Sequence, residues 1–217
     1  MYVHVNAAVS VDGKLSSRRR EQVRISGEAD FARMERVRAV SDAVMVGVGT
    51  VLADDPSLLR HDERHRRDHG KTGVPARVVA DSRARTPPDA DVLDGPATTH
   101  LLVSEMAPAE RVSALADRGA VVHTVGEERV SLPDALDALA GEGVERLMVE
   151  GGGELLFSFF EAELVDELTL YVGSLVIGGR DAPTLVDGEG FTESFPALQL
   201  RDVERLDDGV VLSYDVP

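Results

Sequence analysis

The chain has 217 residues, a formal net charge of −16 and no cysteine. The absence of cysteine excludes disulfide-stapled folds and thiolate metal sites. The hydrophobic content of 43% is enough for a buried core, and the acidic balance argues against nonspecific nucleic-acid binding. No apolar run approaches the roughly 18 residues of a membrane span, and the first 14 residues lack signal-peptide features. We expect a single globular domain over residues 1–217 that works in the cytoplasm.

The basic residues are 21 arginines and only two lysines, Lys14 and Lys71. A surface rich in Asp and Glu but poor in Lys is expected of a protein that works in concentrated salt. At 1 M salt the Debye length falls to roughly 3 Å, so like charges scarcely repel one another. The composition therefore predicts a halophilic protein, with a GC-rich coding bias as the alternative explanation.

Strands alternate with helices along the chain. Apolar, β-branched runs predict strands at residues 3–9, 42–47, 77–81, 98–103, 120–125, 145–149 and 168–177. Helices are predicted after Ser26, at 108–118, from 131 onward and at 155–161, and a hairpin is predicted at 198–216. Alternation of this kind indicates an α/β fold with a mostly parallel central sheet, helices on both faces and an antiparallel C-terminal hairpin.

Two local features complete this prediction. Ser26 is the expected N-cap of the first helix, whose apolar face would carry Phe31, Met34, Val37 and Val40. The polar stretch 60–73 is expected to be an exposed loop. Its histidines, at positions 61, 65 and 69, would share one face of a helix and could bind a metal, but the segment has no apolar face, and we favour a solvated loop without a metal site.

Glycine and small polar residues follow several predicted strands, at 47–50, 81–83, 151–153 and 178–180. In an open α/β sheet, ligands bind beyond the carboxyl ends of the strands. Glycine allows the backbone to approach a ligand closely, and a helix N-terminus offers N–H groups to an anion. The pattern predicts a cradle for a phosphate-bearing ligand, although turns between strands and helices also require glycine. The first strand is not followed by G-x-G-x-x-G, which argues against a Rossmann dinucleotide domain.

Charged residues near these turns are candidate site residues. Lys14 follows the first strand, and a lysine is a point charge suited to a phosphate. Asp54 and Asp55 stand just after Thr50, and paired carboxylates can perform acid–base chemistry. The sequence shows no Ser/His/Asp pattern and no metal-ligand cluster. A bound cofactor is therefore expected to carry out the central chemical step.

The ordered set of motifs resembles the riboflavin-biosynthesis reductases, most closely their stand-alone archaeal form. The motifs are Asn6 with 11–14, 47–51, 53–56, 78–82, 149–153, 164–167, 177–179 and 186–191. The resemblance implies a dihydrofolate-reductase-like fold, NADPH as cofactor and a homodimer. It also implies reduction of a ribosylaminopyrimidine phosphate to its ribityl form, by hydride transfer to C1′ of an open-chain imine. The zinc-deaminase signature of the bifunctional bacterial relatives is missing, and the charged stretch 60–73 is longer than in the relatives.

The resemblance also assigns roles to residues. The NADPH side would comprise Thr50, Asp54, Ser82, Arg83, Gly151, Gly152, Gly153 and Glu154, with Ser82 and Arg83 at the 2′-phosphate. The substrate side would comprise Asn6, Asp12, Lys14, Asp55 and Glu150. Glu150 and Asp55 are the candidate catalytic carboxylates, and the proton donor is either water or a carboxylate such as Glu150.

Two alternatives stay open at this point. One is another NADPH reductase on the same fold, such as a dihydrofolate reductase, although the chain lacks the early tryptophan of those enzymes. The other is a non-catalytic nucleotide-binding module.

Overall fold

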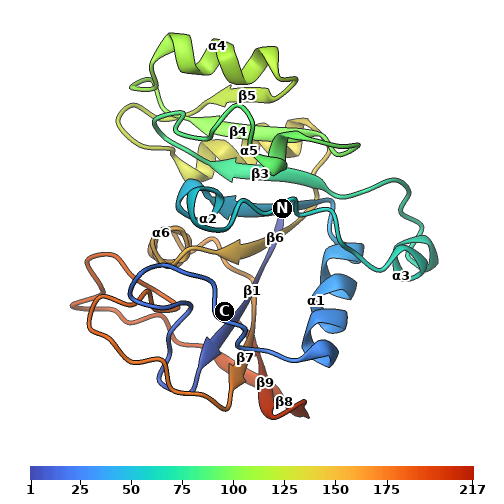
Figure 1. Cartoon of the computed structure of the whole chain (residues 1–217), viewed down its shortest axis with the longest axis vertical. Coiled ribbons are helices and arrows are strands. Elements are labelled where there is room, and N and C mark those ends of the chain that lie inside the picture. Colours follow the sequence, from blue (N-terminus) through green and yellow to red (C-terminus); the bar gives the residue numbers. More distant parts are fainter.

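A computed structural model describes all residues, 1–217, and contains one nine-stranded sheet in the order β5-β4-β3-β2-β6-β1-β7-β9-β8 (Figure 1). The strands are β1 (Tyr2–Ser10), β2 (Ala43–Gly47), β3 (Ala76–Ala80), β4 (Thr99–Val103), β5 (Val121–Thr124), β6 (Arg146–Gly151), β7 (Glu167–Gly173), β8 (Gln199–Leu206) and β9 (Gly209–Asp215). Neighbouring strands are parallel from β5 through β7, while β9 is antiparallel to both β7 and β8. The predicted mostly parallel sheet and closing hairpin are confirmed.

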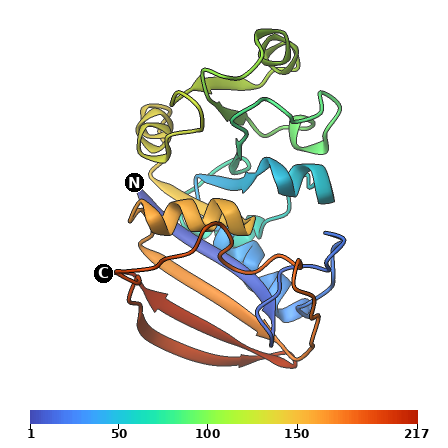
Figure 2. The ribbon, with the colours of Figure 1, turned by 90° about the vertical axis from the view of Figure 1, so that its left-hand side faces the viewer.

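Helices cover both faces of this sheet, as predicted. They are α1 (Glu28–Val40), α2 (Val48–Asp54), α3 (Glu63–Asp68), α4 (Ala109–Asp117), α5 (Leu132–Gly141) and α6 (Gly153–Glu161). Figure 2 shows α6 on one side of the sheet and α2 on the other. None of the helices is both long and apolar enough to cross a lipid bilayer.

Side chains alternate between the two faces along each strand, so each strand contributes to two cores. Met45 and Val149 pack with Phe159 of α6 in one core. Val46 packs with Val51 of α2 in the other. Because these residues are fully or almost fully buried, the sheet and its covering helices form a rigid support for the loops at the strand ends.

The start of α1 differs from the prediction. Gly27, not Ser26, is the N-cap residue, and no side chain of the helix itself caps it. Instead, the carboxylate of Asp207, in the turn between β8 and β9, accepts hydrogen bonds from the N–H groups of Ala29 (3.4 Å) and Asp30 (3.1 Å). The cap comes from a distant part of the chain, so the local sequence did not reveal it.

The predicted apolar face of α1 is also wrong. The buried residues of this helix are Asp30, Arg38 and Ala39, whereas Phe31 is 38% exposed. The reason is that α1 turns Arg38 toward Glu150 of β6, so the inner face of the helix is partly polar. Of the predicted apolar positions, Phe31 borders a cavity, and Met34, Val37 and Val40 are only partly buried.

The charged stretch 60–73 contains a helix where a loop was expected. Asp62 caps α3 by accepting a hydrogen bond from the His65 N–H at 2.8 Å. Arg66 is buried and donates to the carbonyl oxygens of Ala39 (3.0 Å) and Ser41 (2.8 Å) just after α1. A buried arginine that satisfies backbone carbonyls thus takes the place of the missing apolar face. No group of three or more His, Asp or Glu side chains in the structure could hold a metal ion.

Candidate active site

The connections of the sheet reverse direction between β2 and β6. The chain leaves β2 through α2 on one face and leaves β6 through α6 on the other, although the two strands are neighbours. Such a switch point opens a crevice at the carboxyl ends of the strands, where ligands bind in open α/β sheets. The topology therefore places a candidate site beside Gly47 and Glu150.

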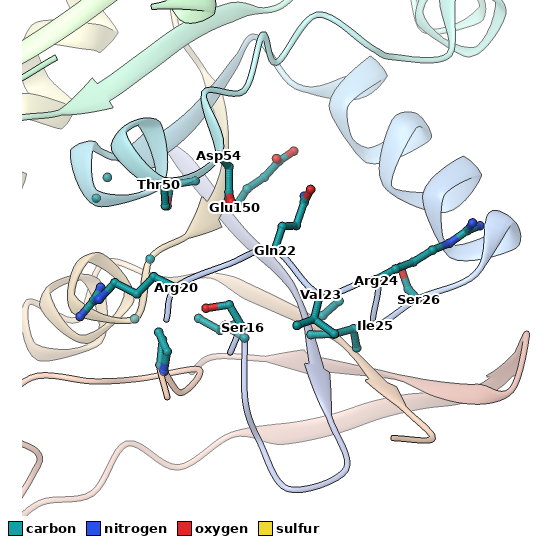
Figure 3. Close-up of a pocket in the computed structure, with 18 of the residues that line it drawn as sticks. Ser16, Arg20, Gln22, Val23, Arg24, Ile25, Ser26, Thr50, Asp54 and Glu150 are labelled. Atoms are coloured by element: carbon teal, nitrogen blue, oxygen red, sulfur yellow. The ribbon is translucent and has the colours of Figure 1, made fainter. Parts of the chain in front are cut away.

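A cavity of about 960 Å³ occupies this place. Its lining includes Gly49, Thr50 and Asp54 of α2, together with Glu150 and the turn Gly152–Glu154. Figure 3 shows Thr50, Asp54 and Glu150 on one side of the cavity and residues 16–26 crossing the other. The volume lies at the upper end of the range typical of small-molecule sites, roughly 300–1,000 Å³.

The turn between β6 and α6 depends on glycine. Gly151 and Gly152 have φ values of 130° and 59°, which residues other than glycine rarely adopt. No side chain caps the first turn of α6, so its N–H groups remain available at the cavity wall. This arrangement can bind an anion through backbone N–H groups and the helix dipole.

Glu150 forms the best-defined polar contact of the cavity wall. Its Oε1 accepts a hydrogen bond from Arg38 Nε at 2.5 Å, and its Oε2 accepts one from Arg38 Nη2 at 2.6 Å. Burial acts to lower the pKa of Arg38, but the attraction and hydrogen bonding of Glu150 outweigh it, and the net shift of the pKa is upward. The pair is a bidentate, charge-assisted contact, so the Glu150 carboxylate is held in one orientation.

Asp54 has a different environment. The residue is solvent-exposed as a whole, yet it forms part of the cavity wall. Partial burial raises the pKa of its carboxyl group above the ordinary value. The protonated form of Asp54 is thereby favoured relative to a free aspartate.

Asp12 and Lys14, both predicted on the substrate side, hold loops and lie outside the cavity lining. Asp12 accepts hydrogen bonds from Ser10 Oγ (2.6 Å) and from the N–H groups of Ile177 (3.1 Å) and Gly178 (2.7 Å). These bonds, the hydroxyl first, lower its pKa to about 2. Lys14 Nζ donates to the carbonyl oxygen of Ala182 at 3.1 Å. Both side chains therefore fix the segment that brings Pro183 to the cavity.

Asn6 and Asp55 also lie outside the lining. Asn6 is buried in β1, two residues before Ala8 of the cavity wall, and its Oδ1 has no hydrogen-bond partner. Asp55 ends α2 in a left-handed conformation (φ 41°) and accepts a hydrogen bond from the Asp91 N–H at 2.9 Å. Its carboxylate thus secures the segment after β3 rather than facing the cavity.

The predicted 2′-phosphate pair stands one strand further along the same sheet edge, after β3. Ser82 Oγ accepts a hydrogen bond from the Val130 N–H at 3.0 Å, and Arg83 is exposed. Neither residue belongs to the cavity lining, and Gly151 does not either.

The sequence reasoning missed the segment that crosses the cavity. Arg20, Gln22, Arg24 and Ile25 all line it, and Figure 3 shows Arg20 extending toward α6. The segment is neither helix nor strand, so it carries no periodic signal. The run of arginines at 18–20, conspicuous in an acidic chain, was the available clue.

Comparisons with known proteins agree with this architecture. The sequence profile of the RibD C-terminal domain matches residues 1–212. The chain is 46% identical over 216 residues to the 2,5-diamino-6-ribosylamino-4(3H)-pyrimidinone 5′-phosphate reductase of Archaeoglobus fulgidus, covering 98% of this chain and 96% of that protein. It is 45% identical over 217 residues to the reductase of the same name from Methanothermobacter thermautotrophicus, covering 99% and 98%.

A solved structure supports the fold. Acinetobacter baumannii RibD matches the whole chain with a TM-score of 0.82 at 26% identity, while this chain spans 58% of that longer one. The predictions of a dihydrofolate-reductase-like fold and of a riboflavin-biosynthesis reductase are confirmed. The chain belongs to the RibD C-terminal domain family.

Proposed function

We propose that the protein reduces the ribosyl side chain of 2,5-diamino-6-ribosylamino-4(3H)-pyrimidinone 5′-phosphate to ribityl, with NADPH as the reductant. The similarity to reductases of that name extends over nearly the whole chain. The structural observation that carries the proposal is the meeting of Thr50, Asp54, Glu150 and the turn Gly152–Glu154 around one cavity at the switch point.

The residues of the cavity suit a nicotinamide dinucleotide. The uncapped first turn of α6 and the glycine turn before it would receive phosphate groups. Thr50 and Asp54 would contact the cofactor from α2, and Arg83, with Ser82, would hold the 2′-phosphate from the end of β3. When bound, NADPH would supply the hydride for C1′ of the open-chain imine.

Glu150 is the catalytic carboxylate in this proposal. It lines the cavity, whereas Asp55 is engaged by a backbone N–H group elsewhere. On the substrate side, Asp12 and Lys14 act by holding residues 177–184 in place, and Asn6 supplies an amide beneath the cavity wall.

The protein is further proposed to act as a homodimer in the cytoplasm of a cell with concentrated internal salt. Strand β8 lies at the sheet edge and is exposed along almost its whole length, including Leu200 and Val203 at 56% and 54%. Exposed apolar side chains on an edge strand favour pairing with another chain.

The test is an assay of NADPH oxidation by absorbance in high KCl, with the ribosylaminopyrimidine phosphate and, separately, with dihydrofolate. Formation of the ribityl product, identified by mass spectrometry, is expected with the first substrate alone. Turnover of dihydrofolate alone would favour another reductase of this fold, and NADPH binding without consumption would favour a non-catalytic module.

A further inference from the structure

Arg38 joins three elements around the cavity. It lies near the end of α1 and is 8% exposed. Besides its two hydrogen bonds to Glu150 on β6, its Nη1 donates to the carbonyl oxygen of Arg60 at 3.1 Å. Residues 60 and 150 both line the cavity, and Arg38 does not. Arg38 therefore contacts the wall of the site from behind.

Stability alone is a weak explanation for this ion pair. Removing two charges from water costs several kcal/mol per ion, and apolar residues of similar volume are often as stabilising or more so. The pair does, however, fix a carboxylate at the cavity. A carboxylate has about four acceptor positions, Arg38 occupies two, and the others remain open to a ligand.

We infer that Arg38 is a positioning residue that holds the Glu150 carboxylate in one orientation, aimed at the reacting part of the substrate. The inference rests on the proposed function. In that reaction the imine nitrogen receives one proton, and a hydride then adds to C1′. The electron pair of the C1′=N bond moves to nitrogen, and NADPH, which would supply the hydride, is oxidised to NADP⁺. Solvent supplies the proton, and the protonated imine carries a positive charge that the Glu150 carboxylate beside it stabilises.

This assignment predicts non-additive effects on turnover. Glu150→Gln and Arg38→Met should each lower kcat at least tenfold, about 1.4 kcal/mol of transition-state stabilisation, with little change in the KM for NADPH. The double variant should be no slower than Glu150→Gln, because Arg38 acts through Glu150. Arg38→Lys keeps the positive charge but cannot donate two parallel hydrogen bonds to the carboxylate. Its kcat should therefore lie between those of Arg38→Met and the wild type.

Arg66 provides a matched control. It is also a buried arginine beside α1, but it donates to backbone carbonyl oxygens alone. Arg66→Met should lower the melting temperature, and its effect on kcat should add to that of Glu150→Gln. Guanidinium chloride at millimolar concentration should restore turnover to Arg38→Ala but not to Arg66→Ala.

The outcomes separate the two proposals. Wild-type protein that does not turn over the substrate would overturn the proposed function and this inference with it. An active wild type in which the Arg38 and Glu150 effects add, or in which Arg38→Met is as fast as wild type, would overturn the role of Arg38 alone.

Discussion

The cap that Asp207 provides to α1 can be removed without straining the backbone. Asp207 has φ 49°, a left-handed conformation that glycine adopts freely and asparagine tolerates. Asp207→Gly therefore deletes both hydrogen bonds to the helix start, and Asp207→Asn removes the charge but keeps an acceptor. Because α1 carries Arg38, the perturbation bears on the candidate site as well as on stability.

The magnitude follows from the two contacts. Loss of an N-cap acceptor typically costs about 1 kcal/mol, and loss of a negative charge at a helix N-terminus about 0.3–1 kcal/mol more. For Asp207→Gly we expect about 1.5 kcal/mol, which corresponds to a fall in melting temperature of about 3–6 °C for a chain of this size. Asp207→Asn should lose only the charge contribution, and molar KCl should shrink that loss by screening.

Gly27 offers a second way to test the Asp207 cap. A Cβ added there would lie 2.5 Å from both Cγ and Oδ2 of Asp207, and the three nearest atoms all belong to that side chain. Gly27→Ala should therefore expel the carboxylate and destabilise the wild type about as much as Asp207→Gly does. In the Asp207→Gly background the same change should be close to neutral.

The assay is thermal unfolding followed by circular dichroism in high KCl, on the two single variants and the double variant. Asp208→Asn removes the same charge from the neighbouring turn position and serves as the control, because its side chain makes no hydrogen bond to α1. Additive losses for Gly27→Ala and Asp207→Gly, or an unchanged melting temperature for Asp207→Gly, would refute the long-range cap.

Three further predictions concern cofactor, pH and salt. Arg83→Ala should raise the Kd for NADPH at least tenfold, about 1.4 kcal/mol, and leave the Kd for NADH unchanged. A fluorescence titration measures both constants, with Arg85→Ala as the control. Equal losses of affinity for the two cofactors would contradict a role of Arg83 at the 2′-phosphate. Burial raises the pKa of Asp54, so its charged form destabilises the fold above that pKa. Asp54→Asn should melt higher than wild type at neutral pH, and the difference should disappear as the pH falls toward about 4, the ordinary aspartate value; a lower melting temperature would contradict this. The melting temperature should rise from low to molar KCl, and a flat response would exclude the halophilic interpretation.

The sequence predicted most of the strands because their residues are buried on both faces. Strand β2 is a continuous apolar run, and β3 and β4 each contain three apolar residues in a row; such runs carry their own signal. The glycine turn at 151–153 was predicted for the same reason, because a strand end is visible from the strand itself, whereas Glu150 was assigned from the resemblance to the reductase family. The features missed depend on distant partners. The Asp207 cap joins residues 178 positions apart, and α3 is anchored by Arg66 bonding to carbonyls after α1.

Three carboxylates show a second limit of prediction from the sequence. Asp12, Asp55 and Glu150 all follow or end an element and carry the same kind of side chain. Only the structure distinguishes them: Asp12 and Asp55 accept hydrogen bonds from backbone N–H groups of other loops, while Glu150 faces the cavity with an arginine behind it. The neighbours of a carboxylate, rather than its position in the chain, determine whether it contacts another loop or faces the cavity.

The distribution of charge around the cavity suggests how an acidic protein can hold anionic ligands. The acidic residues in its lining outnumber the arginines, but Glu150 is paired with Arg38, and Glu35 with Arg60 at 2.8 Å. Glu28, Asp54, Glu154 and Asp187 of the lining have no ion-pair partner, and the arginines left are Arg20 and Arg24, of which Arg24 lies over the ring of Phe31 on α1. Because Arg20 extends toward α6 (Figure 3), we expect a cofactor phosphate group to bind between Arg20 and the start of α6, while Glu150 faces the part of the substrate that becomes positively charged. The separation of Arg20 from Glu150 would keep the anionic groups of the cofactor away from the carboxylate that faces the reacting imine.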